Sequence, residues 1–135
     1  MGYKPIEETK LYDLPCRVAN EIYAQAESWT LFRQNTIGLQ LVRSVDSISA
    51  NLVEGDARFT DRDSVRFVNI GLASCREAQH WVRQAAFRGI IDEETKNRWI
   101  SQLAEVGRML SGLSAFRRKS RSPAVREDSM VYDWE

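Results

Sequence analysis

The sequence predicts an all-α protein, folded as an antiparallel up-down-up-down four-helix bundle. Four segments carry apolar residues at alternating spacings of three and four, the period of one face of an α-helix. Residues that cap or end helices separate these segments. The connections between them are short, which makes consecutive helices antiparallel neighbours. A chain of 135 residues is long enough to bury a core as one domain, without help from metals or disulfides.

The first helix is expected to follow an N-terminal arm, residues 1–12, that is irregular or loosely docked. Pro5 and Pro15 argue against one helix through this region, because proline lacks the amide hydrogen that helix interiors need. Asp13 is the expected N-cap, with Pro15 tolerated in the first turn. The bundle domain is therefore predicted to span residues 13–118. The apolar face of its first helix, which should end near Trp29, consists of Val18, Ile22, Ala26 and Trp29.

The second helix is predicted from about Ile37 to Glu54, after a short connection at residues 30–36. Gly55 is expected to end it, because glycine tolerates the left-handed conformation that commonly terminates helices. Thr60 or Asp61 is expected to cap the third helix. The apolar stripe of the second helix consists of Ile37, Leu41, Val45, Ile48 and Leu52.

The third helix, predicted at residues 61–88, carries two stripes of apolar or small residues rather than one. A helix that is apolar on two faces needs two partners, its own bundle and something else. Association between subunits is the simplest answer, so the chain is expected to form a homo-oligomer. The first stripe consists of Val65, Val68, Leu72, Cys75, Val82 and Ala86, and the second of Phe67, Gly71, Ser74, Ala78, Trp81 and Ala85.

Gly89 is expected to end the third helix, and the fourth helix is expected to follow it and to end near Arg117. Asp92 is its expected N-cap. Residues 119–135 are predicted to be a flexible tail, with a basic part followed by an acidic part that carries Tyr132 and Trp134. The apolar seam of the fourth helix consists of Trp99, Leu103, Val106, Leu110 and Leu113.

The second helix also carries a wholly polar stripe and several small residues that leave room for a neighbouring backbone. Short polar side chains between close helices are typical of packing, so a buried polar network that fixes helix register or a subunit contact is the favoured interpretation. A functional site is the alternative. The stripe consists of Arg43, Ser47, Asn51, Glu54 and Arg58, with Ser44 among the small residues beside it.

This polar pattern resembles the bacterial ribosomal-RNA intervening-sequence protein family, described as four helix bundle proteins. The matching positions include Ser44, Ser47, Asn51, Glu54, Gly55 and Arg58, followed by Phe67, Asn69 and Ile70. The resemblance implies a small helical bundle, typically a ring-like homopentamer, with a poorly known role. The family's genes are associated with insertions in large-subunit ribosomal RNA. Related bundles are accessory variability proteins that hold nucleic acid and a retroelement reverse transcriptase together. Asp46 and Ser49 depart from the family pattern.

Candidate catalytic chemistry is mostly missing from the sequence. His80 is the only histidine, which excludes multi-histidine metal sites and leaves a single residue on which a triad could be built. No glycine-rich phosphate loop is present. Cys16 and Cys75 lack CxxC partners and are expected to be small buried hydrophobes in a reducing compartment. Glu54 is expected to pair with Arg58. The protein is therefore predicted to be no enzyme, and to hold neither metal nor cofactor.

Charge and hydropathy restrict the partners and the cellular location that the sequence predicts. Nineteen basic and nineteen acidic residues cancel, so an electrostatic partner must be attracted by local segregation of charge. No apolar stretch approaches the roughly 20 residues that span a bilayer. The N-terminus has no hydrophobic segment. The sequence predicts a cytoplasmic protein without a membrane partner.

One stripe of the third helix collects four arginines and a histidine without any carboxylate. It consists of Arg62, Arg66, Asn69, Ala73, Arg76, His80, Arg83 and Phe87. A solvated helix face is one interpretation and a phosphate-binding surface is the other. Arg117, Arg118, Lys119 and Arg121 would extend such a surface. No aromatic platform or groove-reading motif accompanies it, so binding without base specificity is expected.

The leading functional hypothesis is a non-enzymatic homo-oligomer that binds RNA or DNA non-specifically through arginine-rich faces. The alternative is a protein-interaction scaffold. Such a scaffold would recruit a reverse transcriptase or another protein through the ring surface or the C-terminal tail, where Tyr132 and Trp134 lie among acidic residues.

Overall fold

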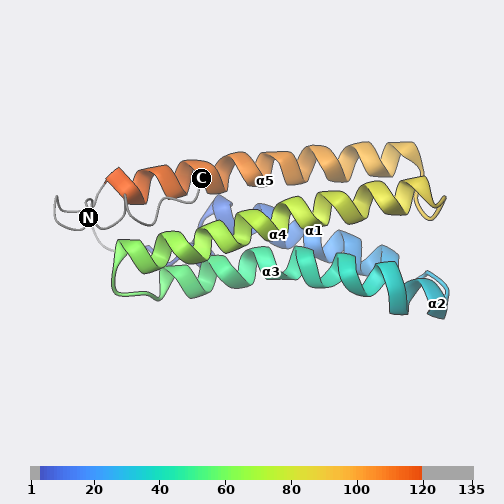
Figure 1. The fold of residues 1–135 in the computed structure, drawn as a ribbon, viewed down its shortest axis with the longest axis horizontal. Helices are drawn as coiled ribbons and strands as arrows, with labels where there is room; N and C mark the ends of the chain where they lie inside the picture. The colour runs from blue at the N-terminus through green and yellow to red at the C-terminus, as the bar shows by residue number, and fades with distance from the viewer. Residues whose placement is uncertain (1–3, 120–135) are drawn as a thin grey trace.

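The structure, a computed structural model, describes residues 4–119 of the 135-residue chain. Four long helices form a bundle, and the described part of the chain contains no β-strand (Figure 1). The elements in chain order are η1 (Ile6–Glu8), α1 (Lys10–Ala26), α2 (Leu31–Arg33), η2 (Gln34–Gly38), α3 (Leu39–Asp56), α4 (Asp61–Phe87) and α5 (Glu93–Lys119). The predicted all-α bundle is confirmed at this level.

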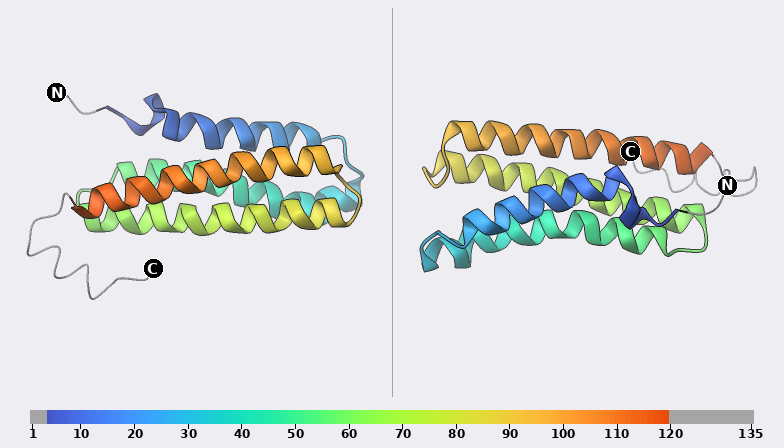
Figure 2. Two further views of the ribbon diagram at one scale, coloured as in Figure 1. Left: turned by 90° about the horizontal axis from the view of Figure 1, so that it is seen from above. Right: turned by 180° about the vertical axis from the view of Figure 1, so that it is seen from behind.

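Each long helix packs against two others. α4 lies between α3 and α5, and α1 packs against α3 and α5 on the far side of the core. Gly55 lies against Ser64 near the α3–α4 turn, while Ser47 reaches Ser74 further along both helices. In the views of Figure 2, each long helix starts at the end of the bundle where the preceding one finished.

The core is a single apolar cluster along the bundle axis. All five residues of the predicted α3 stripe are buried, as are Trp99, Leu103, Val106 and Leu110 of α5. Trp99 is the largest fully buried side chain. Its indole Nε1 donates a hydrogen bond of 2.7 Å to Oε2 of Glu21, so its polar atom is satisfied by a neighbouring helix.

The N-terminal part of the chain is more ordered than the sequence predicted. α1 begins at Lys10 rather than after Asp13, and a 3-10 turn precedes it. Ile6 is buried in the core, and its backbone N–H donates to the Asp56 carboxylate at 3.1 Å. The expectation of an irregular or loosely docked segment is therefore wrong for residues 6–12. Pro15 lies inside α1, where it is buried.

The predicted connection at residues 30–36 is helical instead. α1 ends at Ala26, and the chain re-enters helix at Leu31, so that α2 and the π-helical turn η2 lead directly into α3. Thr30 starts this segment, because its hydroxyl accepts the backbone N–H of Arg33 at 3.3 Å. Within the turns that follow, the Thr36 hydroxyl donates to the Phe32 carbonyl at 2.7 Å.

Gly55 has a different role from the predicted one. It lies inside α3, which continues to Asp56, and Gly89 is the residue of the described chain with a positive φ, at 72°. A Cβ at Gly55 would lie 3.1 Å from the Ser64 carbonyl oxygen and 3.2 Å from the Phe67 Cβ. Glycine at this position therefore allows close packing of α4 and does not form a left-handed turn.

The remaining helix ends follow the prediction. Gly89 ends the α4 region in the left-handed conformation. The hydroxyl of Thr60 accepts the backbone N–H of Asp63 at 3.1 Å at the start of α4. The carboxylate of Asp92 accepts the backbone N–H of Thr95 at 2.8 Å at the start of α5. Hydrogen bonding from the Thr95 side chain, and then from its backbone, lowers the pKa of Asp92. Local capping chemistry thus determines these boundaries.

The two stripes of α4 are both accounted for within one chain. Gly71, Ala78 and Ala85 of the second stripe are buried, as are Val68 and other members of the first. α4 has two long neighbours, α3 and α5, and each covers part of its apolar surface. Both partners that the two stripes require are thus present within one bundle, so the expected homo-oligomer stays a prediction that α4 alone does not demand.

Candidate nucleic-acid interface

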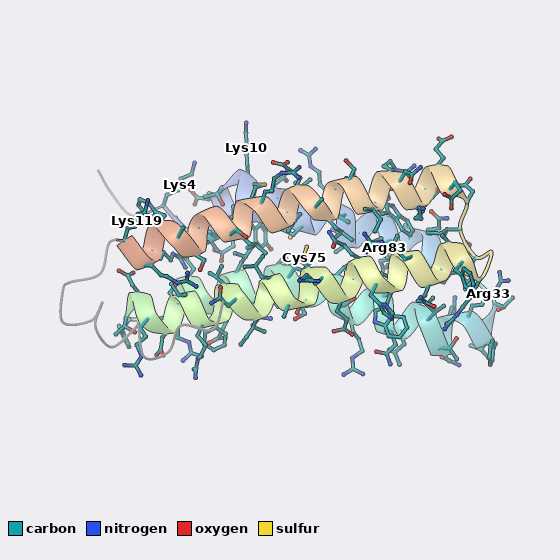
Figure 3. The ribbon with its side chains drawn as sticks, turned by 45° about the horizontal axis from the view of Figure 1, so that its top comes forward. Lys4, Lys10, Arg33, Cys75, Arg83 and Lys119 are labelled. Atoms are coloured by element: carbon teal, nitrogen blue, oxygen red, sulfur yellow. The ribbon has the colours of Figure 1, made fainter. Side chains whose placement is uncertain are left out.

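A groove of about 680 Å³ runs between α4 and α5, here termed the α4–α5 groove. Its cationic side chains come from both helices: Arg76 and Arg83 from α4, and Arg108 from α5, with His80 beside them. Figure 3 shows Arg83 and Cys75 along α4 next to α5. The other lining residues are Leu72, Cys75, Gln79, Gln84, Ala104, Gly107 and Ser111.

The groove exists because the residues where α4 and α5 meet are small. A Cβ at Gly107 would lie 3.9 Å from the sulfur of Cys75, an ordinary van der Waals contact, so the two positions face each other. The Cys75 thiol donates to the Leu103 carbonyl at 3.1 Å, and burial raises its pKa to about 11. Cys75 is therefore a neutral, buried residue as predicted, whereas Cys16 is half-buried.

No carboxylate lines this groove. Within residues 4–119, Arg76 and Arg83 form no ion pair, while Arg108 Nε pairs with Glu105 Oε1 at 3.1 Å. The nearby Glu77 carboxylate accepts the indole N–H of Trp81 at 3.1 Å. The charged side chains that line the groove are therefore all cationic, with the Glu105 and Glu77 carboxylates close by and the charges of the whole chain cancelling.

The predicted arginine stripe of α4 is divided by the structure. Arg76, His80 and Arg83 line the groove, but Arg62 and Arg66 do not. The Arg66 guanidinium lies over the Phe67 ring at 5.3 Å, nearer the α3–α4 turn, and Arg62 is half-buried. The part of the stripe that the structure brings together is its C-terminal half.

Arg117 of the predicted basic extension is engaged in holding the bundle end together. Its guanidinium donates to the Ser64 hydroxyl and lies 3.4 Å from the Asp56 carboxylate, and its side chain is only 16% exposed. Asp56 also accepts the backbone N–H of Ile6. Arg118 and Lys119 are the last residues of α5, and Figure 3 labels Lys119 at the end of that helix. Arg121 lies outside the described residues.

Two motif residues of α3, Ser47 and Asn51, form a hydrogen-bonded network with Ser74 at the contact with α4. The hydroxyls of Ser47 and Ser74 lie 2.8 Å apart, which links the two helices. The side-chain amide of Asn51 donates to the carbonyl and hydroxyl of Ser47 at 2.8 and 2.9 Å. Ser44 is buried, and its hydroxyl donates to the Leu41 carbonyl.

The three charged motif residues, of which Arg58 lies just beyond α3, point toward solvent. Arg43, Glu54 and Arg58 are exposed, and Arg58 forms an ion pair with Glu54 four residues earlier. The Arg58 guanidinium also lies over the Phe67 ring, 4.4 Å from its centroid. Asn51, Glu54 and Arg58 line neither of the two hollows described for this bundle.

Sequence reasoning did not single out Arg108, which is the α5 contribution to the groove. The helical seam through Val106 and Leu110 indicated that Arg108 would lie off the core. It could not indicate which residues of α4 would face it, because the register between two helices depends on their packing.

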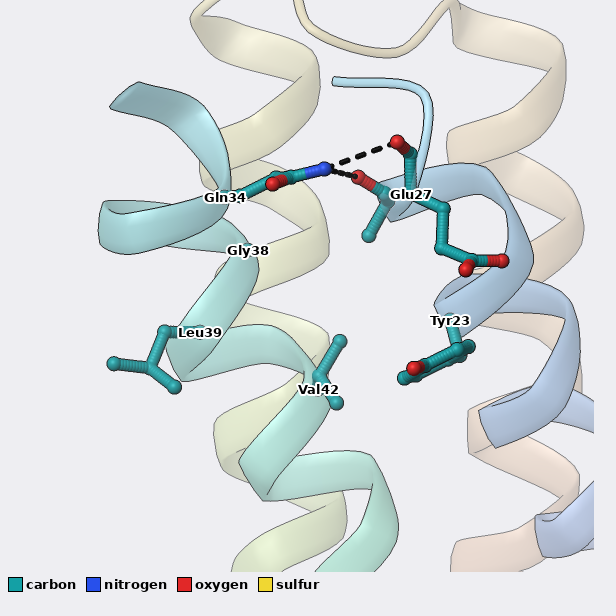
Figure 4. A pocket seen from close by; sticks show the side chains of 7 residues that line it. Tyr23, Glu27, Gln34, Gly38, Leu39 and Val42 are labelled. Carbon is teal, nitrogen blue, oxygen red and sulfur yellow. Dashed lines mark hydrogen bonds between the residues drawn. The ribbon is translucent and has the colours of Figure 1, made fainter. Parts of the chain in front are cut away.

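A second hollow of about 410 Å³ lies between α1 and α3, here termed the α1–α3 groove (Figure 4). The side-chain amide of Gln34 donates to the carbonyls of Ala26 and Glu27 at 3.2 and 3.0 Å, and so joins the two segments. Leu31 and Phe32 at the same end of the bundle are 71% and 77% exposed. The lining residues are Tyr23, Ala26, Glu27, Gln34, Gly38, Leu39 and Val42.

The described residues, 4–119, contain no group of three or more histidine, cysteine, aspartate or glutamate side chains that could hold a metal ion. None of the helices in this part of the chain is both long and apolar enough to cross a membrane.

Comparison with known proteins agrees with the resemblance drawn from the α3 motif. The family model described as 23S rRNA-intervening sequence protein matches residues 7–112. The chain belongs to this family. The match includes all of α1, α3 and α4 and most of α5, so the family assignment covers the bundle as a whole.

A solved structure shares the fold of this member of the 23S rRNA-intervening sequence protein family. It is the crystal structure of a protein with unknown function from the S23 ribosomal protein family of Bacteroides thetaiotaomicron VPI-5482. The TM-score is 0.70 at 21% sequence identity, with 77% of this chain and 97% of that one covered. No curated protein matches the sequence.

Proposed function

We propose that this 23S rRNA-intervening sequence family member binds RNA or DNA through the α4–α5 groove, without strong sequence specificity. The observation that carries the proposal is the lining of the groove, which combines three arginines and a histidine with no carboxylate. In this proposal the protein is a non-enzymatic, cytoplasmic homo-oligomer of antiparallel up-down-up-down bundles. The reversal of direction between consecutive long helices in Figure 2 supports that topology.

The spacing of the groove arginines suits a phosphate backbone. Arg76 and Arg83 lie seven residues apart on α4, which corresponds to about 10.5 Å along the helix axis. Successive phosphates of one strand advance by about 3.4 Å along a duplex axis, so the two guanidiniums would contact phosphates about three steps apart. The planar donors of arginine match phosphate oxygens, and Arg108 adds a third guanidinium from the opposite wall.

Oligomerisation would repeat the groove around a symmetry axis and raise the positive field of the assembly. In this proposal the number of subunits, five, comes from the family resemblance. The exposed Leu31, Phe32 and Leu39 support a contact between copies, because neighbouring exposed apolar side chains mark interaction surfaces.

A non-enzymatic role is supported by the positions of the polar motif residues. Asn51 uses its amide on Ser47, and Glu54 is paired with Arg58, so these groups do not converge on a hollow that could hold a substrate. His80 packs edge-on against Trp81, with ring centroids 4.7 Å apart, and its groove neighbours are arginines rather than a carboxylate.

The test is fluorescence anisotropy of labelled RNA and duplex DNA against the purified protein over a salt series. The wild type should show a log–log salt slope of about −0.9 per phosphate contact on duplex. Reversal of charge in the variant Arg76→Glu/Arg83→Glu should weaken binding. It should also make the log–log salt slope shallower by the amount that corresponds to about two phosphate contacts. The matched control Lys10→Glu/Arg43→Glu changes net charge equally on exposed positions outside the groove, and should retain most of the affinity.

Two results would overturn this proposal. The first is that the wild type binds neither nucleic acid at low salt. The second is that both double variants weaken binding equally, because the effect would then belong to net charge rather than to the groove.

We propose a protein-interaction scaffold as the second candidate function, and the α1–α3 groove is the observation that favours it. Tyr23, Leu39, Leu31 and Phe32 present exposed apolar surface beside this groove, which suits an apolar partner segment. Deletion of residues 127–135, which lie outside the described part of the chain, tests whether the C-terminal tail recruits the protein partner. Loss of a protein partner with intact nucleic-acid binding would favour the scaffold.

A further inference from the structure

We propose that the α4–α5 groove also receives the base of an unpaired nucleotide, so that the protein prefers single-stranded or bulged nucleic acid to continuous duplex. The inference deepens the proposed function and rests on it, because it assigns the phosphates of the same strand to Arg76, Arg83 and Arg108. It adds a second contact, to a base, and a criterion by which the protein would select its ligand.

The floor of the groove is apolar, which a site for phosphates alone does not require. Leu72, Ala104 and Gly107 are half-buried and line the groove together with the sulfur of Cys75. A phosphate is strongly hydrated and gains nothing from such a floor, whereas the face of a base is apolar and stacks or packs on it. The combination of a cationic rim and an apolar floor therefore fits a nucleotide better than it fits a backbone.

Polar side chains along the groove remain available for the edges of a base. Over residues 4–119, the side chains of Gln79, Gln84 and Ser111 make no hydrogen bond within the protein. An amide offers both donors and acceptors, and a hydroxyl offers both as well, so these groups can pair with any base edge. They would favour base contact without demanding one base, in agreement with weak sequence specificity.

His80 adds a ring at the rim of the groove. Its edge-on contact with Trp81, at an interplanar angle of 66°, supports the imidazole from one side. Histidine is among the side chains on which unstacked bases of single-stranded RNA pack. The volume of about 680 Å³ lies within the usual range of ligand sites, roughly 300–1,000 Å³, so a base with its sugar and phosphate would fit.

A continuous duplex cannot place a base in the groove. Paired bases stack inside the helix and cannot extend a face into a groove between two protein helices, whereas bases of loops, bulges and free strands can be splayed out. The preference for unpaired nucleic acid thus follows from the floor of the groove, and the charge on its rim contributes to binding of both forms.

The experiment fills the floor and leaves the rim unchanged. Gly107→Leu places a larger side chain where a Cβ has room beside Cys75, and Ala104→Leu is a second filling variant if the first proves unstable. Gly112→Leu is the matched control, because Gly112 is exposed on the same helix and a Cβ there would meet nothing within 4 Å. Thermal unfolding confirms that each variant is folded.

The probes are three labelled ligands of about 12 nucleotides per strand, which matches typical single-strand sites. They are a single-stranded RNA, an abasic strand with the same number of phosphates, and a duplex. The wild type should bind the base-bearing strand at least about five-fold more tightly than the abasic strand, the lower limit for one stacked base. Gly107→Leu should abolish that preference and leave affinity for the abasic strand and the duplex unchanged, whereas Gly112→Leu should retain it.

Equal binding of base-bearing and abasic strands by the wild type would overturn the base site, and so would a preference that survives in both filling variants. These failures leave the proposed phosphate role intact if Arg76→Glu/Arg83→Glu still weakens all three ligands. Conversely, if the filling variants abolish the preference for bases but Arg76→Glu/Arg83→Glu does not lower the affinity for any of the three ligands, the base site would be supported and the phosphate role overturned.

Discussion

Oε2 of Glu21 accepts the indole N–H of Trp99 at 2.7 Å and the guanidinium Nε of Arg98 at 2.9 Å, and so fastens α1 to α5. α1 is separated from α5 by two intervening long helices in the sequence, so this contact closes the bundle. The carboxylate is partly shielded, and it satisfies the one polar atom of the largest buried side chain.

This contact predicts a stability that depends on pH. Partial burial raises the pKa of Glu21, but the hydrogen bonds from Trp99 and Arg98 outweigh burial and lower the pKa below its ordinary value. A depressed pKa in the folded state contributes stability above the ordinary value of about 4.3, and that stability is lost as the pH falls through the folded-state pKa. Glu21→Gln should therefore cost about 1 kcal/mol at neutral pH, and less below about pH 4.

Urea unfolding followed by circular dichroism, at pH 7 and at pH 3, measures this difference. If Glu21→Gln lowers the free energy of unfolding equally at pH 7 and pH 3, the charge of Glu21 contributes nothing to stability. Only its shape and its role as a hydrogen-bond acceptor would then matter.

The close contact at Gly55 predicts a steric effect. In Gly55→Ala the new Cβ would meet the Ser64 carbonyl at 3.1 Å and the Phe67 Cβ at 3.2 Å, so α4 must shift. We expect a loss of about 1–3 kcal/mol in the free energy of unfolding. Gly112→Ala is the control, since it has open space and should be stabilised by up to about 1 kcal/mol through helix propensity. Equal effects of the two substitutions in thermal unfolding would contradict the packing role of Gly55.

The serine–asparagine network predicts that the α3 motif acts on stability rather than on ligand binding. Asn51→Ala removes the amide that donates to Ser47, and should cost about 1 kcal/mol. Its affinity for nucleic acid should equal that of the wild type, because Asn51 lies outside the α4–α5 groove. Denaturation and anisotropy on the same preparation separate the two properties. Weaker binding with unchanged stability would assign the motif a functional role instead.

The contact of Arg117 with Asp56 predicts a structural role for the first residue of the basic segment. Both side chains are mostly buried, at 16% and 12% exposed, so Arg117→Met leaves a carboxylate without this partner at the end of the bundle. We expect a loss of about 2–3 kcal/mol in stability, with little change in the salt slope of nucleic-acid binding. Arg43→Met, at an exposed position of α3, serves as the control and should not change stability measurably. A salt slope reduced as much as in the groove variants would show that Arg117 contacts phosphate.

Local chemistry made some features of the fold predictable. Thr60 and Asp92 cap their helices with their own side chains, and Gly89 adopts a conformation that few other residues tolerate, so each boundary is encoded within a few residues. The seam that contains Trp99 and Leu103 was equally clear, because apolar periodicity depends only on helix geometry.

Features that depend on the relation between helices were not predictable in the same way. Gly55 suggested a left-handed turn, but its reason is the approach of α4, which no local pattern encodes. Ile6 is held in the core by a contact distant in sequence, since the Asp56 carboxylate of α3 accepts its backbone N–H. The α4–α5 groove was half predicted, through Arg76, His80 and Arg83, and its other wall with Arg108 depended on helix register.

The arrangement in which α4 packs against both of its neighbours in sequence bears on how the chain folds. The α3–α4 and α4–α5 pairs are joined by turns of a few residues, so each can close as a helical hairpin at small entropic cost. Docking of α1 onto α5 instead closes a loop of most of the chain, and long-range contacts of this kind slow folding. The helices α3, α4 and α5, two of which line the groove, can therefore come together before the helix that completes the core, and local unfolding would begin at α1 while the groove remains assembled.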